Sequence, residues 1–489
     1  MENSPYKQCP VYKKCSGCQL QNMDYESQLR WKQGLVGRLL SSFCRVNPII
    51  GMKAPVHYRN KAQAVLRTAK GGKLVSGVYQ SKTNGVVSTD TCMLNTEKAN
   101  EIIASVRALL KSFKLWAYNP YDGSGFLKHV LVRQGFQSGE IMVVLVTSTI
   151  TFPAKNNFVK ALLKEHPDIT TIVLNVNDHP YKMMLGPAEK TLYGKGYITD
   201  TLCGRTFKIS PRSFYQVNPV QTELLYKKAA EMARLGGKET VIDAYCGVGT
   251  IGIYCSAFVK QVIGAELSRD AVRDAIENAK LNQIKNIYFH CRDAGEFMRE
   301  LAGSGEQIDV VFTDPPRSGC SMEFLNALTV LRPGRIVYIS CNPQTQQRDL
   351  RFITQNGYKV REIQPVDMFP HTNHVETVVL LSHKKADSYI HIDVEFGEGE
   401  GKIPVDSIAK RAEAYKPKEK VTYKMIKEYI EAKYGFKVHT AYIAEVKRNL
   451  GLPMYDAPNA VEELKQPRKH PTPEKVEAIK DALRYFAVI

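Results

Sequence analysis

The sequence predicts an α/β protein built around a doubly wound, Rossmann-like sheet, and three observations support this prediction. Between residues 211 and 383, short runs of aliphatic and β-branched residues alternate with stretches of helical periodicity. One of these runs leads into a glycine-rich turn, Gly247 to Gly252, of the form G-x-G-x-x-G. Several other runs end in acidic or polar residues, as is typical where ligands bind at the carboxyl edge of an open sheet.

Length and composition predict a multidomain protein with a polyanionic partner. The 489 residues are enough for two or three domains with a core in each. Lys and Arg number 67 against 49 Asp and Glu, which gives a formal net charge of +18. Such an excess favours a nucleic-acid partner, because each neutralised phosphate releases counterions. The alternative is a protein that is merely basic.

The sequence carries no signal for export or for a membrane. Its first residues lack the apolar stretch of a signal peptide, and no apolar run approaches the roughly 20 residues of a membrane span. We therefore expect a cytoplasmic protein without membrane association, and nothing in the sequence implies a protein partner.

Three closely spaced cysteines open the chain. Cys9, Cys15 and Cys18 form C-x5-C-x2-C, and Cys92 is a candidate fourth thiol. In a cytoplasmic protein such cysteines are more typical of free thiols or metal ligands than of disulfides. Four thiolates suit either a tetrahedral zinc ion or an iron-sulfur cluster, and the spacing alone does not separate the two metals. Unused structural thiols are the alternative.

Residues 1–210 otherwise predict a β-rich region that follows one helix. Residues 23–43 have helical periodicity, and strand-like runs follow, with hairpin turns expected at Gly135 and at Ser138–Gly139. Basic and aromatic residues are interleaved in this region: Arg59, Lys61, Arg67, Lys70, Lys73, Lys128 and Arg133 with Tyr58, Tyr79 and Phe126. This mixture suits a surface that binds RNA through phosphates and stacked bases, but it is equally compatible with a solvated β surface.

Residues 211–383 supply the alternating elements of the predicted doubly wound sheet. Asn218–Pro219 has the form of a helix cap followed by proline at the first helical position. The strand candidates are residues 240–245, 261–267, 286–291, 309–314, 335–340 and 375–381. The helix candidates are residues 219–234, 250–258, 269–282, 322–330 and 344–356.

Residues 384–489 predict a basic, mainly helical extension. A polar, glycine-rich stretch is followed by a helix, a glycine turn, a second helix and, near the end, a third. The paired basic helices are compatible with a helix-turn-helix reader of nucleic acid, although a solvated helical hairpin is the simpler interpretation.

The glycine turn predicts a cofactor with a ribose. Glu266 follows Gly247 by 19 residues and ends the next strand, which is the spacing at which an acid accepts hydrogen bonds from ribose hydroxyls. This pattern also permits NAD. Asp243, just before the glycines, suits a cationic ligand without phosphates, such as S-adenosylmethionine, better than it suits a pyrophosphate. Asp293 ends the third strand candidate and is expected to meet an adenine amino group.

A thiol at a strand end predicts nucleophilic chemistry. Cys341 follows the strand candidate 335–340, and the proline after Asn342 shapes a tight turn. Thiolate addition to carbon 6 of uracil activates carbon 5 for methylation, and a base must then remove the carbon 5 proton. Glu376 is the candidate base. Cys320 is a rival thiol, and a buried structural role is the alternative for Cys341.

The strand candidate 309–314 ends in Asp314-Pro315-Pro316-Arg317. Methyltransferases that act on exocyclic amines place an aromatic ring after such prolines, to stack the target base. Arg317 stands at that position here, which argues against amine methylation.

Together these segments resemble the RNA uracil-5-methyltransferase family, especially its 23S ribosomal RNA branch. The resemblance covers residues 5–383 and rests on the N-terminal cysteines and on SFYQVN, DAYCGVGTIG, DPPR, SCNP and HVE. It implies a methyltransferase domain that binds S-adenosylmethionine through Gln216, Tyr245, Thr250, Glu266, Asp293 and Asp314, together with the turn at Gly247. It also implies Cys341 as nucleophile, Glu376 as base and a 4Fe-4S cluster on Cys9, Cys15, Cys18 and Cys92.

The expected activity is therefore 5-methyluridine formation in 23S ribosomal RNA. Transfer RNA is the alternative substrate, and a non-catalytic RNA-binding assembly factor is the alternative class of function. The extension 384–489 lies outside the part of the chain that resembles the family.

Overall fold

The computed structural model describes residues 9–69, 71–80, 83, 85–179, 184–383, 423–450 and 470–485. The chain divides into two compact units, Met1–Tyr389 and Ile390–Ile489. No helix in the described part of the chain is both long enough and apolar enough to cross a membrane.

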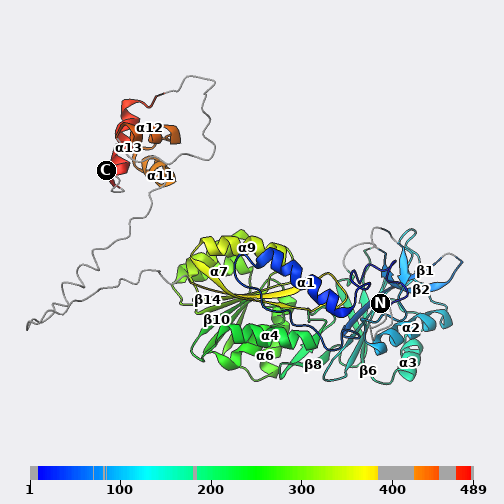
Figure 1. Cartoon of the computed structure of the whole chain (residues 1–489). Coiled ribbons are helices and arrows are strands. Elements are labelled where there is room, and N and C mark those ends of the chain that lie inside the picture. The colour runs from blue at the N-terminus through cyan, green and yellow to red at the C-terminus, as the bar shows by residue number, and fades with distance from the viewer. Residues whose placement is uncertain are drawn as a thin grey trace, which may run out of the picture. The chain divides into compact units, whose positions relative to one another are not determined.

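The glycine turn belongs to a sheet that, within the described residues, has seven strands (Figure 1). They are β10 (Thr240–Ala244), β11 (Gln261–Glu266), β12 (Ile287–Cys291), β13 (Val310–Thr313), β14 (Arg335–Ser340), β15 (Tyr358–Val366) and β16 (Glu376–His383). In space their order is β12-β11-β10-β13-β14-β16-β15. Strands β10 to β14 are parallel, and β16 is antiparallel to both of its neighbours. All six predicted strands are present, and β15 is a seventh that the sequence pattern did not predict.

Helices cover both faces of this sheet, as predicted. One face carries α4 (Pro219–Ala233), α5 (Thr250–Cys255) and α6 (Arg269–Leu281), and the other carries α1 (Tyr25–Leu40), α7 (Ala294–Ser304), α8 (Met322–Leu331) and α9 (Pro343–Gln355). Successive strand residues face opposite cores, because side chains alternate along a strand: Val241 lies in one core and Ile242 in the other. A short 3₁₀ turn, η1 (Ser256–Phe258), follows α5.

Helix α4 begins as its sequence predicts. The Asn218 side chain accepts a hydrogen bond from the Gln221 amide, and Pro219 occupies the first helical turn. Helix α7 was not predicted, although Asp293 caps it by accepting hydrogen bonds from the Gly295 and Glu296 amides.

A second sheet is built from the β-rich region. Its strands are β1 (Lys61–Thr68), β2 (Leu74–Tyr79), β3 (Val86–Ser88), β4 (Leu127–Gln134), β5 (Ile141–Thr147), β6 (Ile169–Val176) and β7 (Ala188–Tyr193), in the order β3-β2-β1-β4-β5-β6-β7. The predicted hairpin turn is confirmed between β4 and β5, where Gly139 has a φ of 72°. Helices α2 (Glu97–Ser112) and α3 (Lys155–Glu165) pack on one face of this sheet.

The centre of this sheet is buried on both faces, which explains the uninterrupted apolar run of β5. Val143 and Leu145 face the core formed with α2 and α3. Val144 and Val146 face a core that also contains residues of the sheet with the glycine turn. The hairpin β8 (Ile198–Leu202) and β9 (Arg205–Ile209) contributes to this shared core. The two sheets therefore meet across a common apolar interior.

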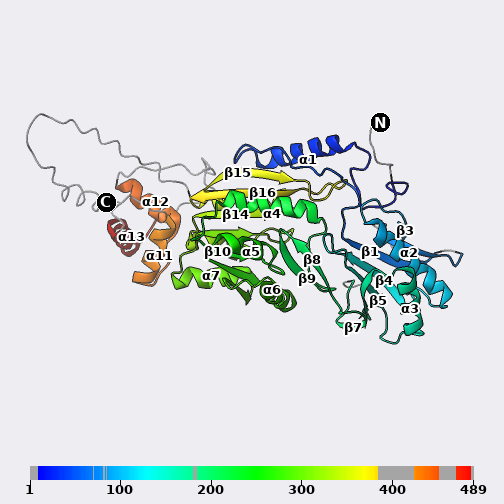
Figure 2. The same ribbon diagram turned by 90° about the horizontal axis from the view of Figure 1, so that it is seen from below.

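Helix α1 and the segment after it pack against the sheet that carries the glycine turn (Figure 2). Val36 and Leu40 are fully buried in its core. Further along, single bridges join Val46 to Ile363 and Ile50 to Val366 of β15. A boundary at residue 210 therefore does not separate this N-terminal segment from residues 211–383.

The second unit contains three described helices, α11 (Tyr423–Tyr434), α12 (Thr440–Asn449) and α13 (Pro473–Tyr485). They enclose a small core that includes Ile430, Ile443 and Ile479. Gly435, which directly follows α11, has a φ of 73°. The polar, glycine-rich stretch predicted after residue 383 lies outside the described residues.

Candidate active site

Most of the predicted cofactor and catalytic residues lie at one edge of the seven-stranded sheet of β10 to β16. Parallel strands end at the same edge, so the residues that follow consecutive strands are brought together. After β10, β11, β12, β13 and β14 come, in turn, Tyr245, Glu266 at the end of its strand, Asp293, Asp314 and Cys341.

The glycine turn has the backbone conformation that its residues predict. Gly247 and Gly249 have φ values of 55° and 82°, and Tyr245 has a φ of 64°. The Glu266 carboxylate accepts hydrogen bonds from the Gly247 amide at 3.1 Å and from the Ser268 amide at 2.7 Å. These bonds fix Glu266 against the turn, and a carboxylate with two such bonds still has acceptor capacity for ribose hydroxyls.

Asp243 does not have the position that the charge argument assumed. It is 1% exposed, and its carboxylate accepts a hydrogen bond from the Gly252 amide at 2.8 Å. Burial raises the pKa of Asp243 to about 7, although the Gly252 amide opposes this shift. Asp243 therefore holds the backbone of the turn at Gly252.

The remaining cofactor candidates are held by other contacts. Thr250 forms a hydroxyl–hydroxyl hydrogen bond of 3.0 Å with Tyr226 of α4. The backbone carbonyl of Gln216, in the segment before α4, accepts a hydrogen bond from Asn60 Nδ2 at 3.1 Å. Tyr226 was not predicted as a site residue, because a single tyrosine in an amphipathic helix gives no functional signal. Its pKa is raised by burial and by the nearby charge of Asp314.

Cys341 and Glu376 lie near each other. Strands β14 and β16 pair Ser340 with Thr377 in the last step of their antiparallel ladder, so Cys341 directly follows one member of this pair and Glu376 directly precedes the other. The charge of Glu376 raises the pKa of Cys341, as expected for neighbouring groups. Residues 35 apart in the sequence thereby come together at the strand edge, which is the juxtaposition that a nucleophile and a base require.

The electrostatics of Cys341, Glu376 and Asp314 are coupled. Burial raises the pKa of Glu376 to about 8, with a further increase from Asp314 and an opposing effect of Arg317. Burial raises the pKa of Cys341 to about 11, and Glu376 and Asp314 add to that shift. Burial also raises the pKa of Asp314 to about 7. A cation bound beside these groups favours their ionised forms, so the site is suited to a positively charged ligand.

The turn that carries Cys341 is tied to the Asp-Pro-Pro-Arg turn after β13. The side chains of Asn342 and Thr345 both donate hydrogen bonds to the Arg317 carbonyl, at 3.0 Å and 3.3 Å. The exposed Arg317 side chain lowers the pKa of both Cys341 and Glu376. The positive charge of Arg317 therefore favours the ionised forms of the Cys341 thiol and the Glu376 carboxyl group.

The rival thiol, Cys320, has a different environment. It is 5% exposed, and burial raises its pKa to about 12. Its backbone amide donates to Asp349 Oδ2 at 2.8 Å. Cys341 is only half-buried. Of the two, Cys341 is the thiol that a substrate can reach.

The four N-terminal candidate ligands are near one another. Cys9, Cys15, Cys18 and Cys92 line one cavity and are each partly exposed. Burial raises the pKa of Cys18 to about 12, and the neighbouring thiols of Cys92, Cys15 and Cys9 add to this shift. The donor set fits a metal that prefers thiolates. Nevertheless, no three His, Cys, Asp or Glu residues among those described are arranged as a preformed metal site.

Four of the residues assigned to an RNA-binding surface are buried. Arg133 is 4% exposed, and its guanidinium donates hydrogen bonds to the Pro211 carbonyl at 3.3 Å and to the Ser213 carbonyl at 2.5 Å. The other three, Lys128, Tyr58 and Phe126, are 4%, 3% and 7% exposed. These four residues lie in the protein interior, so for them neither an RNA-binding surface nor a solvated one is found.

The rest of the predicted RNA-binding set keeps some exposure. Tyr79 is 45% exposed. Lys73 is also exposed, whereas Arg59, Lys61 and Arg67 are partly buried. Lys70 lies outside the described residues. These residues keep the choice between an RNA-binding surface and a solvated one open.

Comparison with known proteins identifies what this arrangement resembles. Residues 184–384 match the family model described as tRNA (Uracil-5-)-methyltransferase. The chain is 42% identical over 382 residues to an uncharacterized RNA methyltransferase of Oceanobacillus iheyensis. The aligned region covers 77% of this chain and 83% of the relative. The chain is also 42% identical over 381 residues to an uncharacterized RNA methyltransferase of Halalkalibacterium halodurans, with the same shares covered.

A solved structure has the same overall architecture. It is the tRNA (uracil-54, C5)-methyltransferase of Pyrococcus abyssi in complex with S-adenosyl-L-homocysteine. The TM-score is 0.63 at 29% sequence identity, and the similarity covers 75% of this chain and 86% of that one.

Proposed function

The chain belongs to the RNA uracil-5-methyltransferase family, and from this premise we propose that it methylates carbon 5 of a uridine in 23S ribosomal RNA with S-adenosyl-L-methionine. The observation that carries the proposal is the proximity of Cys341 to Glu376 and Asp314 at the strand edge. A thiol and two carboxyl groups in one site suit covalent addition next to a cationic methyl donor.

S-adenosylmethionine supplies the methyl group and a positive sulfonium charge. The residues that we expect to hold it are Gln216, Tyr245, Gly247, Thr250, Glu266, Asp293 and Asp314. Glu266 is already oriented by two backbone amides and suits ribose hydroxyls. Asp314 is positioned next to Cys341, so its carboxylate is expected to attract the cationic end of the cofactor.

Cys341 starts the reaction. After its proton is lost to solvent, the thiolate attacks carbon 6 of the uracil, a sulfur–carbon bond forms, and the electrons of the carbon 5–carbon 6 double bond move to the carbon 4 carbonyl. Carbon 5 of this enolate takes the methyl group, and the electrons of the broken sulfur–methyl bond stay on the departing thioether. Glu376 then removes the carbon 5 proton, the double bond reforms, and Cys341 is expelled.

Arg317 assists both groups in this scheme. Its charge lowers the pKa of the thiol and of the Glu376 carboxyl, which favours the nucleophilic and basic forms. A uridine that is paired in its RNA must be extruded to reach Cys341, at a cost of about a few kcal/mol.

We also propose that Cys9, Cys15, Cys18 and Cys92 hold a 4Fe-4S cluster. The proposal is supported by the cavity that they share and by the resemblance of these cysteines to those of the 23S ribosomal RNA branch. Protein purified without oxygen should contain about four irons per chain, as the proposed cluster requires. Zinc without iron would instead point to a tetrahedral thiolate site.

Transfer RNA is the second candidate substrate, because the Pyrococcus abyssi enzyme of similar structure is a tRNA methyltransferase. A direct test is to map 5-methyluridine in total RNA from cells with and without the gene. Loss of a 23S ribosomal RNA modification supports the proposal, and loss confined to tRNA contradicts its substrate assignment. Unchanged RNA, with purified protein that binds 23S RNA without methylating it, would favour a non-catalytic assembly factor.

A further inference from the structure

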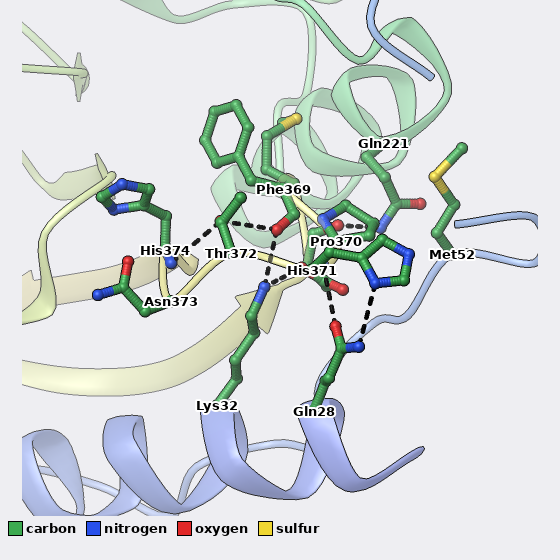
Figure 3. Close-up of polar contacts among 12 residues, drawn as sticks. Gln28, Lys32, Met52, Gln221, Phe369, Pro370, His371, Thr372, Asn373 and His374 are labelled. Carbon is green, nitrogen blue, oxygen red and sulfur yellow. Dashed lines mark hydrogen bonds and ion pairs between the residues drawn. The ribbon is translucent and has the colours of Figure 1, made fainter. Parts of the chain in front are cut away.

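The segment between β15 and β16 delivers Glu376 to the active site and is held by residues from the start of the chain. It runs over residues 367–375 and is followed directly by Glu376. Figure 3 shows Gln28 and Lys32 of α1 reaching toward it from one side. More than 330 residues separate these partners in the sequence, so only the folded chain brings them together.

Lys32 forms a fully buried ion pair with this segment. Its ammonium group lies 2.5 Å from Asp367 Oδ1 and donates a second hydrogen bond to the Phe369 carbonyl at 3.0 Å. Both side chains of the ion pair have no exposed surface. The second carboxylate oxygen of Asp367 accepts a hydrogen bond from the Tyr25 hydroxyl at 2.8 Å. A buried pair adds little net stability over an apolar pair but fixes geometry, because each charge must keep its partner.

Gln28 holds the middle of the segment. Its Nε2 donates to His371 Nδ1 at 3.1 Å, and its Oε1 accepts from the His371 amide at 2.9 Å (Figure 3). The His371 carbonyl accepts from the Leu20 amide at 3.0 Å. His371 has a φ of 68°, a left-handed conformation that a non-glycine residue keeps only when its surroundings impose it. Gln28 and Leu20 supply that constraint.

The loop that carries Cys9, Cys15 and Cys18, which we call the cysteine loop, also contacts the segment before Glu376. The Gln19 side chain, next to Cys18, accepts a hydrogen bond from the Asn373 amide at 3.3 Å. The Tyr58 hydroxyl donates to the Pro370 carbonyl at 3.0 Å. The segment that precedes Glu376 is thus bonded on several sides to residues 19–58.

We propose that Lys32 and Gln28 are positioning residues that set the Glu376 carboxylate for removal of the carbon 5 proton. The inference rests on the proposed function. The hydrogen bonds of these two side chains go to Met23 and to residues 367–371, so we expect them to act by fixing the backbone that carries Glu376. Their loss is therefore expected to slow proton removal more than the preceding methyl transfer.

The test separates the two steps in single turnovers with a 23S ribosomal RNA transcript labelled with tritium at uracil carbon 5. Methyl transfer is followed with carbon-14 in the S-adenosylmethionine methyl group, and proton removal by tritium released to water. We expect Lys32→Met and Gln28→Leu to transfer methyl within about threefold of the wild-type rate. Tritium release should be at least about tenfold slower, with accumulation of a covalent protein–RNA species.

Arg30→Ala is the matched control, since Arg30 is on the exposed face of the same helix and should change neither step. Melting temperatures establish that each variant is folded, and Gln28→Leu, which breaks no ion pair, keeps the test valid if Lys32→Met does not fold. Equal slowing of both steps, or no change in their ratio, overturns the inference.

Failure of the proposed function has a different signature. In that case the wild-type protein itself transfers no methyl group to the transcript or releases no tritium. Glu376→Gln then also fails to accumulate a covalent species.

Discussion

At the scale of single residues, the reactivity of a thiol depends on its exposure and on the carboxylates near it. Cys341 is half-buried directly after β14 and lies close to Glu376. Cys320 is 5% exposed, with a pKa of about 12. A reactive cysteine must be reachable and able to ionise, and Cys341 meets these conditions better.

The two thiols give the first prediction. Cys341→Ala should reduce methylation of 23S RNA by at least about 10⁴-fold, because no other described group can replace the covalent addition. Cys320→Ala should keep activity within about fivefold of wild type. RNA affinity, measured by filter binding, should be unchanged by Cys341→Ala. Normal turnover by Cys341→Ala would remove this residue from the mechanism.

Glu376 gives a prediction about stability and pH. Its pKa is about 8 in the folded chain against an ordinary value of 4.5. Between these values the folded state keeps a proton that the unfolded state has lost, so the free energy of unfolding decreases as the pH rises from about 4.5 to about 8. Glu376→Gln removes this effect and should raise the melting temperature by about 2 °C or more at pH 8.

The difference should shrink toward pH 5, where the Glu376 carboxyl group is protonated in the fold and is as neutral as the glutamine amide that replaces it. Glu101→Gln, on the exposed face of α2, is the control and should show no such pH dependence. A melting temperature of Glu376→Gln below that of wild type at pH 8 would mean that the carboxylate stabilises the fold.

The positions of single residues at strand ends were predicted correctly where a local motif defines them. Cys341 and Asp314 each follow a recognisable strand, and their strand-end positions needed no long-range information. Arg133 was assigned wrongly because its sequence neighbours resemble a basic surface, whereas its guanidinium contacts two carbonyls about 80 residues away. The residues next to Arg133 in the sequence do not reveal that distant backbone carbonyls bury its charge.

At the scale of elements, two glycines of the glycine turn are required for different reasons. Gly249 has a φ of 82°, and a Cβ at this position would lie 2.9 Å from Phe289 Cζ. Gly247 has a φ of 55°, and a Cβ there would meet no heavy atom within 4 Å. Gly247 is thus required mainly for its backbone conformation, whereas Gly249 is required for conformation and for close packing.

We therefore predict different costs for alanine at these positions. Gly247→Ala should destabilise the fold by about 1–2 kcal/mol, the cost of a left-handed alanine. Gly249→Ala should cost clearly more, because Phe289 must also move. Thermal melting of the two variants side by side measures the difference. Equal melting temperatures would show that the ring of Phe289 moves aside without a measurable cost in stability.

Two of the elements that were missed, β15 and α7, lack a clean periodic pattern. Strand β15 contains Lys359, Arg361, Glu362 and Pro365 among its nine residues, so it does not read as an apolar run. Helix α7 contains Gly295 and Gly303, which lower helix propensity. Strand β15 is held by its pairing with β16, and α7 packs against the sheet. Helices α2 and α3 were also missed, because the region that contains them was interpreted as β-rich throughout.

At the scale of the whole molecule, the N-terminal cysteine loop and the active site share a structural element. Gln19 is adjacent to Cys18 and bonds to Asn373, three residues before Glu376. The pairing of β14 with β16 and the contacts of α1 with residues 367–371 join distant parts of the sequence. No local pattern predicts such contacts, which is why the sheet order and this connection emerged only from the structure.

With the 4Fe-4S cluster that we propose, this connection predicts that loss of iron increases the motion of the segment before Glu376. Removing iron with a chelator should loosen the cysteine loop, and the peptide spanning residues 370–374 should exchange its amide hydrogens at least about threefold faster. A peptide from α6 is the control. Unchanged exchange in residues 370–374 after complete iron removal would uncouple the metal site from the Glu376 segment.

The net charge of +18 predicts RNA binding that weakens with salt. The logarithm of affinity should fall with the logarithm of salt concentration by about 0.7 for each single-strand phosphate contacted. Lys73→Ala, at an exposed position, should reduce this slope, whereas the buried Arg133 should contribute nothing to it. A salt-independent affinity would mean that the excess of Lys and Arg side chains does not bind RNA phosphates.

The central claim is that Cys341 bonds to carbon 6 of a uridine. A 23S RNA transcript made with 5-fluorouridine tests it directly, because fluorine at carbon 5 leaves no proton for Glu376 to remove. After incubation with S-adenosylmethionine, mass spectrometry should find one methylated nucleotide adduct, on the peptide that contains Cys341. An adduct on Cys320, or no adduct from protein that methylates ordinary transcript, would contradict the mechanism.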